Sequence, residues 1–329
     1  SGGGPISIAG QDNPVVGRDS TGLALETSMI FSGTGKISIF GKMATGCTNN
    51  WHRAIMTGWG GTTYLISNST ATDAVYIRGN SATCDNANSV YANAVQGLNG
   101  YTYVAAPSGG GISISGTQGS ANFTAGTWGT DAQESDILEL NYYHLVANSG
   151  PITLNAVKAT TSTRWGVRFA TRGGLYSHVG ALPAAVTTGY TAYPTLAAVA
   201  STSDFTINAD SICTYYTNIN TGGNIKFAPN ANTFDYTQYM NAVDWATNWY
   251  GPYASVQIGK PGTSGANQTS SNFTLDKISA TGDIKLYGGT ITLKGGATTS
   301  AMSGTGVLVK ATADIVVNAG TSTTRNPVS

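Results

Sequence analysis

Apolar and polar residues alternate in short segments along the chain, and glycines bound these segments. In residues 282–296, Asp283-Ile-Lys-Leu-Tyr-Gly288 and Thr290-Ile-Thr-Leu-Lys294 both place apolar side chains at every second position. A period of two is typical of a strand that buries one face. Glycine enters positive-φ conformations without steric cost, so the flanking glycines indicate sharp turns. The pattern predicts short strands joined by tight turns.

The same short segment recurs through the chain, and missing such a repeat would lead to the wrong fold. Copies begin at Ile6, Ile37, Ile112, Ile152, Phe205, Ile225, Phe273, Ile284 and Ile315. With the strand candidate Ala74-Val-Tyr-Ile77 between Ile37 and Ile112, the spacing up to Ile152 is about 31 to 40 residues, which leaves room for three short strands in each coil of a stacked β-solenoid. A β-sandwich of hairpins is the structural alternative, but a sandwich does not require one segment to recur with the same flanking residues.

The spacing of the copies predicts one continuous solenoid domain with two long insertions. The expected ranges are regular coils over 1–163, an insertion over 164–204, a coil over 205–228, a second insertion over 229–271, and coils over 272–329. In the second insertion, apolar residues at helical spacing predict a short aromatic helix over about 235–250. Asp235 could cap the start of this helix, and Gly251-Pro252 is a stop signal.

Composition excludes several classes of function. Charged residues make up 10% of the chain, and 16 basic residues balance 16 acidic ones, so no overall field favours nucleic acid or an anionic membrane. No run of about 18 apolar residues occurs, which argues against a membrane-spanning helix. Ser, Thr and Asn supply most of the polar positions. A surface hydrated by hydroxyls and amides is typical of an extracellular or cell-surface protein.

The acidic residues offer weak candidates for catalysis. Glu134 and Asp136 would share one strand face and, with Glu139, form the densest acidic cluster. Paired carboxylates can perform glycoside hydrolysis or bind calcium. The structural alternative is that Asp136, like Asp204, is a turn residue that accepts backbone hydrogen bonds at the start of a strand.

No other motif predicts a cofactor or a metal. The histidines His52, His144 and His178 do not have the spacing of a zinc site, and each is expected to pack or to face solvent. Phosphate-binding loops and serine-nucleophile elbows are absent from the sequence. We therefore expect neither a cofactor nor a metal.

Aromatic residues are concentrated in the second predicted insertion. The candidate ligand-binding surface consists of Tyr236, Tyr239, Trp245, Trp249, Tyr250 and Tyr253. Exposed aromatic rings stack on sugars or anchor protein interfaces. The alternative is that these rings pack against the flank of the solenoid.

Two cysteines are candidates for a disulfide. Cys47 and Cys84 are 37 residues apart, close to one coil, so they could lie above one another. Two buried free thiols are the equal alternative, and Cys213 would be unpaired in either case.

The segment Gly282-Asp-Ile-Lys-Leu-Tyr-Gly-Gly289, together with Asp314-Ile-Val-Val-Asn-Ala-Gly320, resembles the repeats of filamentous-haemagglutinin-like exoproteins. These are large bacterial surface adhesins of the two-partner or autotransporter type. The resemblance covers the strand segments between residues 5 and 320 and not the insertions. It implies a right-handed parallel β-helix displayed outside the cell, which acts in attachment or cell–cell contact.

The sequence therefore predicts a secreted structural or adhesive β-solenoid without enzymatic activity. Its expected partners are a glycan or another cell-surface ligand, and further copies of itself stacked end to end into filaments. The alternative is a carbohydrate-active β-helix, either a polysaccharide lyase or a tailspike-like glycosidase.

Overall fold

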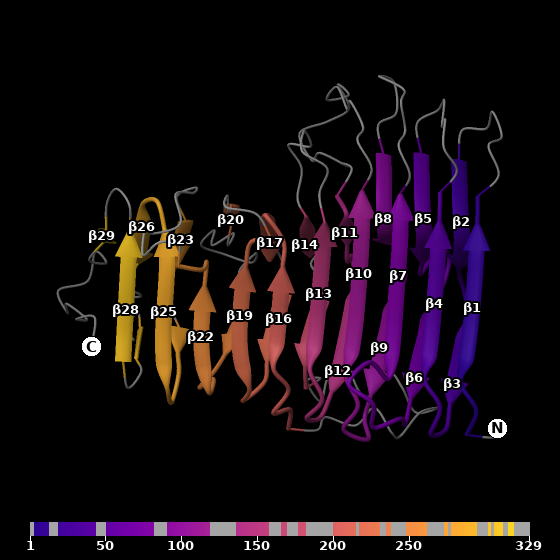
Figure 1. The fold of residues 1–329 in the computed structure, drawn as a ribbon, viewed down its shortest axis with the longest axis horizontal. Coiled ribbons are helices and arrows are strands. Elements are labelled where there is room, and N and C mark those ends of the chain that lie inside the picture. Colours follow the sequence, from indigo (N-terminus) through magenta and orange to yellow (C-terminus); the bar gives the residue numbers. More distant parts are fainter. Residues whose placement is uncertain are drawn as a thin grey trace.

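The computed structural model describes sixteen segments of the chain. They are residues 3–12, 19–43, 51–81, 91–118, 136–157, 166–169, 177–181, 200–214, 217–230, 235–237, 248–261, 273–275, 278–294, 302–303, 306–311 and 315–318. Every regular element in these segments is a β-strand (Figure 1). The described part of the chain contains no helix long and apolar enough to cross a membrane.

Sheet A is the longest sheet and contains ten strands. Its strands, in spatial order, are β1 (Ile6–Gln11), β4 (Ile37–Lys42), β7 (Val75–Ser81), β10 (Ile112–Gln118), β13 (Ile152–Val157), β16 (Phe205–Asn208), β19 (Asn224–Ala228), β22 (Ser255–Ile258), β25 (Asp283–Gly288) and β28 (Gly306–Ala311). In Figure 1 they stand side by side across the front of the molecule, from β1 near the N-terminus to β28 near the C-terminus. Seven of these ten strands contain a copy of the repeated segment.

Two further sheets of seven strands each complete the walls. Sheet B consists of β2 (Asp19–Leu25), β5 (Trp51–Thr57), β8 (Tyr91–Gly97), β11 (Leu138–Glu139), β14 (Val167–Phe169), β17 (Ser211–Thr214) and β20 (Asp235–Thr237). Sheet C consists of β3 (Met29–Ser32), β6 (Thr63–Ser67), β9 (Thr102–Ala106), β12 (Tyr143–Ala147), β15 (Ser177–Gly180), β18 (Thr217–Asn220) and β21 (Asn248–Tyr250). In each of these sheets the neighbour of a strand lies three strands further along the chain, so one coil supplies one strand to each wall.

Toward the C-terminus, two smaller sheets continue the stacking. One contains β23 (Phe273–Leu275), β26 (Ile291–Lys294) and β29 (Ile315–Asn318), and the other contains β24 (Ile278–Ser279) and β27 (Met302–Ser303). Strand pairing is parallel in every sheet, for example Ile112 with Ile152 and Ile291 with Ile315. The prediction of an all-β solenoid with stacked parallel strands is therefore confirmed, and a sandwich of antiparallel hairpins is excluded for the described residues.

The core consists of in-register columns of aliphatic side chains. One column in sheet A runs through Ile39, Ile77, Ile114, Leu154, Ile207, Phe227, Ile258 and Leu286. All of these side chains are fully buried. Burial of each side chain of this size contributes about 1.5–3 kcal/mol relative to exposure. Because parallel pairing aligns like residues of successive coils, the repeated segment produces a continuous hydrophobic interior.

The glycine after each early copy of the segment allows two walls to meet. A Cβ atom at Gly79 would lie 2.0 Å from the carbonyl oxygen of Ala94 in sheet B, and one at Gly41 would lie 2.1 Å from that of Ala54. These distances are too short for any side chain. The glycine at this position lies within the strand, and the close approach of sheet B requires it.

The structure corrects the predicted aromatic helix over 235–250. Residues 235–237 and 248–250 form β20 and β21, which pair with β17 and β18. Residues 238–247 lie outside the described residues. The helical spacing of aromatic residues was misleading because parallel pairing with the preceding coil determines the conformation at both ends of the range.

The two ranges predicted as insertions, 164–204 and 229–271, contain wall strands. The first includes β14 and β15, and the second includes β20, β21 and β22. Buried and half-buried side chains alternate in β14 and β22, whereas all four residues of β15 are buried. The coil pattern therefore continues through both ranges.

Candidate functional site

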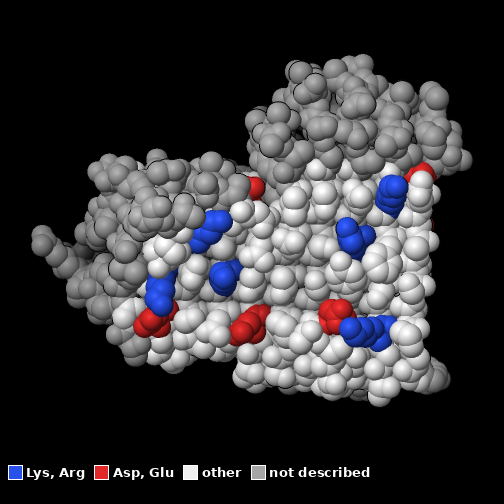
Figure 2. All heavy atoms as spheres, in the orientation of Figure 1, with Lys and Arg blue, Asp and Glu red and all other residues white. Residues whose placement is uncertain are grey.

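The outer faces of the three walls carry the polar chemistry of the molecule, and they differ from one another. On sheet A, side chains between the buried positions are exposed or half-buried. Figure 2 shows this face, where a few charged side chains are separated by wide uncharged areas. On sheets B and C, the corresponding side chains are largely buried. Each face is a separate candidate site.

Of the two predicted catalytic candidates, Glu134 lies outside the described residues, and Asp136 is part of a buried ion network. Asp136 is fully buried and accepts a hydrogen bond from Nε of Arg168. Nη2 of Arg168 lies 3.0 Å from Oε1 of Glu139. One guanidinium group on β14 thus joins the two carboxylates at and before β11. The position of Asp136 is that of a structural ion-pair partner, with no open side facing a cleft.

Glu139 is the centre of this network on the outer face of sheet B. Its Oε2 accepts hydrogen bonds from Asn93 at 2.8 Å and Gln96 at 2.7 Å, and its Oε1 accepts one from Asn141 at 2.8 Å in addition to Arg168. Gln96 in turn accepts a hydrogen bond from Nε of Arg53. Four donor side chains therefore converge on one buried carboxylate group.

A β-bulge in β8 makes this arrangement possible. The backbone N–H groups of Ala94 and Val95 both donate to the carbonyl oxygen of Ile137, at 3.0 and 3.1 Å. Two residues opposite one is the pattern of a bulge, and it shifts the alternation of side chains by one position. Asn93 and Gln96, three residues apart, can therefore reach the same carboxylate.

The electrostatics of Arg168 follow from its neighbours. Burial disfavours its charged form, but the carboxylates of Asp136 and Glu139 outweigh that effect, so the pKa of Arg168 is raised above its ordinary value. Arg168 is therefore cationic at every accessible pH. The network can hold coils together, because Arg168 lies on the coil that follows the one carrying Asp136 and Glu139.

A column of aromatic and histidine rings lies on the outer face of sheet C. Strand register aligns Tyr64, Tyr103, His144, His178 and Asn218. Ring centroids are 5.2 Å apart for Tyr64–Tyr103, 4.4 Å for Tyr103–His144 and 4.8 Å for His144–His178. The three central rings are at most 5% exposed. We call this set the ring column.

The two histidines of the ring column are neutral at physiological pH. Their Nδ1 atoms are 3.1 Å apart, and Nε2 of His178 lies 3.0 Å from Nδ2 of Asn218. Burial lowers the pKa of His178 to about 4, and burial together with the neighbouring His178 lowers the pKa of His144 well below its ordinary value. Two charged rings would place two Nδ1–H groups against each other, so this pair opposes protonation.

The predicted aromatic surface is only partly described. Tyr253 is fully buried, and its hydroxyl group donates a hydrogen bond to the carbonyl oxygen of Ile219 at 3.0 Å. Tyr253 therefore packs in the core and is not part of a ligand-binding surface. Tyr236, Trp249 and Tyr250 lie on strands β20 and β21, and Tyr239 and Trp245 lie outside the described residues. For these five residues ligand binding stays a prediction.

The cysteine candidates Cys47 and Cys84 lie outside the described residues, so their pairing stays a prediction. Cys213 is buried and forms no disulfide with a described residue. No group of three or more His, Cys, Asp or Glu side chains capable of holding a metal ion occurs in the described segments.

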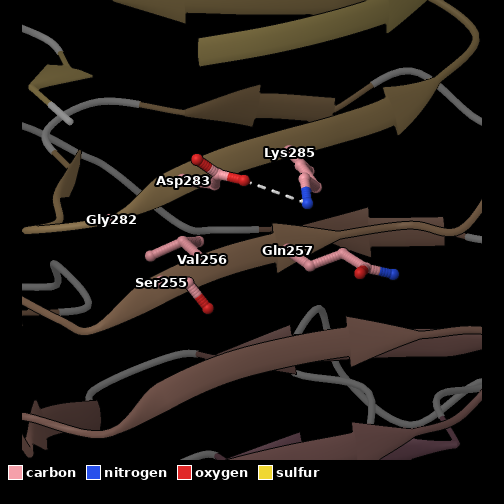
Figure 3. Close-up of a pocket in the computed structure, with 6 residues that line it drawn as sticks. All are labelled: Ser255, Val256, Gln257, Gly282, Asp283 and Lys285. Atoms are coloured by element: carbon pink, nitrogen blue, oxygen red, sulfur yellow. Dashed lines mark ion pairs between the residues drawn. The ribbon is translucent and has the colours of Figure 1, made fainter. Parts of the chain in front are cut away.

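An open hollow of about 330 Å³ lies between β22 and β25 on the outer face of sheet A (Figure 3). Its lining includes Asp283 and Lys285, whose side chains point toward each other and form an ion pair of 3.1 Å, and Gln257 on the neighbouring strand. Both charged side chains are about half exposed. The hollow is small and neutral overall, which suits a contact site for polar groups more than a catalytic cleft.

Two exposed aromatic features do not follow from the repeat. Trp59 is 47% exposed in the turn between β5 and β6, between Gly58 and Gly60, which adopt φ angles of 68° and 71°. Phe40 and Tyr76 form a half-exposed pair on sheet A. The Gly-Trp-Gly sequence and the aromatic residues at outward positions of β4 and β7 are the signals that could have indicated them.

Comparison of the chain with protein-family models, with curated proteins and with solved structures finds no match.

Proposed function

We propose that this protein is an extracellular structural and adhesive β-solenoid of the filamentous-haemagglutinin-like kind, part of a larger secreted surface protein that mediates attachment or cell–cell contact. The observation that carries the proposal is the combination of a regular ten-stranded parallel wall with an outer face of hydroxyl and amide groups. A rigid, weakly charged, hydrated wall offers many polar contacts to a ligand outside the cell. The right-handed sense of the coils belongs to the same proposal, since parallel crossovers in one sheet are nearly always right-handed.

The enzymatic alternative, a lyase or glycosidase, has less support. A glycosidase needs two carboxyl groups that face a substrate cleft, one of which exchanges a proton. Asp136 and Glu139 are instead buried and share the guanidinium group of Arg168. This buried network does not supply the two carboxyl groups that hydrolysis needs. We therefore propose that the protein binds carbohydrate on the outer face of sheet A and does not cleave it.

Adhesion assays on the purified chain test the proposal. Beads coated with the protein should bind to some members of a panel of cells and immobilised glycans. The same protein, incubated with soluble polysaccharides, should release no reducing ends or unsaturated products. A matched control is Ile114→Asp, which places a carboxylate among the buried side chains of sheet A and should abolish adhesion together with the fold.

Cleavage of a polysaccharide, or adhesion equal to that of Ile114→Asp, would refute the proposal. We also propose that the protein associates end to end into filaments, and electron microscopy tests this directly. Filaments in which the solenoid axis runs along the fibre would support this part, and monomers at every concentration would count against it.

A further inference from the structure

One region of sheet A combines half-buried aromatic rings with positive charge that has no carboxylate partner among the described residues. Phe40 and Lys42 lie on β4, Tyr76 and Arg78 on β7, and Ser113 and Ser115 on β10, all at outward positions. We call these six residues the β4–β10 patch. The rings of Phe40 and Tyr76 meet edge to face, with centroids 5.8 Å apart at 70°.

The patch is held rigidly from beneath. The residues between its members, such as Ile39, Ile77 and Ile114, are fully buried in the core. Strand register places Tyr76 beside Ser113 and Arg78 between Phe40 and Ser115. The rings therefore stand among small hydroxyl side chains on a flat surface. A ligand ring could stack on them while its hydroxyl groups reach Ser113, whereas the hydroxyl oxygen of Ser115 is covered.

The positive charge of the patch has no carboxylate partner among the described residues. Elsewhere on sheet A, Lys36 pairs with Asp73 at 2.5 Å and Lys285 pairs with Asp283 at 3.1 Å. Lys42 and Arg78 are exposed and form no such pair. Asp12 lies beside the end of β4, where its N–H donates to the carbonyl oxygen of Lys42, but its carboxylate accepts a hydrogen bond from Ser20.

We propose that the β4–β10 patch binds a carboxylated polysaccharide, with sugar rings stacked on Tyr76 and Phe40 and sugar carboxylates on Arg78 and Lys42. Arginine suits this role because its planar guanidinium group binds a carboxylate through two parallel hydrogen bonds. Since strands in a sheet lie about 4.8 Å apart, successive strands offer a regular series of contacts to a repeating polymer.

Charge density argues against a nucleic acid on this surface. Tight binding to duplex DNA uses about six to ten cationic contacts with phosphates. The patch supplies two cations, and Lys226 on β19 lies four strands from Arg78 on β7. A polymer that combines sparse negative charge with hydroxyl groups and apolar ring faces matches the patch better.

Binding of the full chain to four polymers tests the assignment. Polygalacturonate supplies carboxylates, its methyl ester has the same rings without the charge, dextran is a neutral polymer, and duplex DNA is a phosphate polymer. Polygalacturonate should bind at least tenfold more tightly than each of the other three. The Arg78→Gln variant should weaken that binding about tenfold because a charge-assisted hydrogen bond is lost. The Tyr76→Ala variant should do so about tenfold because a stacked ring is lost.

The matched control is Lys226→Gln, which removes one exposed cation from the same face but outside the patch, and should leave binding within about twofold. Thermal unfolding of each variant, expected to match the parent chain, shows that the wall is intact. Equal binding of the methyl ester, equal or tighter binding of DNA, or equal losses in Lys226→Gln and Arg78→Gln would each overturn the assignment.

This inference rests on the proposed adhesive function, but the two can fail separately. If the parent chain adheres to cells and Arg78→Gln adheres equally well, adhesion stands and the patch is not its site. If polygalacturonate binds through the patch while the chain adheres to no cell, the patch stands and the adhesive function falls.

Discussion

The outer face of sheet A and the outer faces of sheets B and C both carry polar side chains, but they differ in how deeply those side chains are buried. On sheet A, polar side chains such as Ser113 and Asn155 contact solvent, and the ion pairs are exposed. On sheet B, Arg168, Asp136 and Glu139 form a buried network. Burial alters the energetics because unpaired polar groups become costly when water is excluded.

Because of this difference in burial, we expect substitutions on sheet A to affect ligand binding and substitutions on sheets B and C to affect stability. The polar groups of sheet A are available to a ligand, so changing them should alter binding with little effect on folding. Many polar groups of sheets B and C bond to side chains of neighbouring coils, so changing them should weaken the contact between coils. The predictions below test that division, beginning with the largest expected effect.

The largest effect is expected from removing the buried cation of sheet B. Arg168→Met keeps much of the side-chain volume but leaves the carboxylates of Asp136 and Glu139 without their common partner. We expect the free energy of unfolding to fall by about 3–5 kcal/mol, as for other broken buried ion pairs. Urea or thermal unfolding, followed by circular dichroism, measures it.

Arg78→Met on sheet A is the matched control, since it makes the same substitution at an exposed arginine. It should change the free energy of unfolding by at most about 0.5 kcal/mol. Equal effects of Arg168→Met and Arg78→Met would show that the two faces do not differ in the way described.

Within sheet A, neighbouring residues on opposite faces should also differ. Ile114→Ala removes a fully buried side chain from the aliphatic column and should cost about 2–5 kcal/mol. Ser115→Ala changes the next residue, on the outer face, and should cost less than about 1 kcal/mol. A larger loss from Ser115→Ala than from Ile114→Ala would contradict the observed register.

The ring column of sheet C predicts a dependence of stability on pH. The folded pKa of His178, about 4, lies below the ordinary value of 6.5, so between these values the unfolded chain binds more protons. The free energy of unfolding is therefore highest above about pH 6.5, and it falls as the pH falls toward 4. At 1.36 kcal/mol per pKa unit, the loss is about 3 kcal/mol for His178, with a further loss in the same direction for His144.

Replacing both histidines tests the origin of this effect. His144 and His178 face Tyr101, Tyr103 and Asn218, of which none titrates between pH 6.5 and 4. The double variant His144→Phe/His178→Phe should therefore flatten the pH dependence of the midpoint of unfolding between pH 6.5 and 5, where few carboxylates titrate. An unchanged slope would assign the effect to other groups.

The sequence predicts the strands of sheet A well and the contents of the other walls poorly. The alternation around Ile37, Ile112 and Ile152 reports one buried face, and that face is buried in the structure. In β9 and β12, both faces are buried, so alternation is lost. Local sequence therefore indicates a strand in those walls without indicating which side chains meet.

The partners in the candidate sites depend on coil length, which local pattern does not encode. Glu139 meets Asn93 across 46 residues and Arg168 across 29, and the bulge at Ala94 decides which side chains of β8 reach it. His144 and His178, likewise, are neighbours only because two coils of different length stack in register. The predicted pairing of Glu134 with Asp136 considered alternation within a single strand and so missed the cation on the next coil.

The smallest effect is expected from an exposed ion pair of sheet A. Lys36 lies 2.5 Å from Asp73, and the two side chains are 46% and 42% exposed, so water and salt screen their attraction. Lys36→Gln should therefore lower the free energy of unfolding by less than about 1 kcal/mol, and the difference should vanish in about 1 M salt. Thermal unfolding at low and high salt measures both quantities. A loss approaching that of Arg168→Met, or one that persists in high salt, would mean that the outer face of sheet A contributes to coil stacking as the buried faces do.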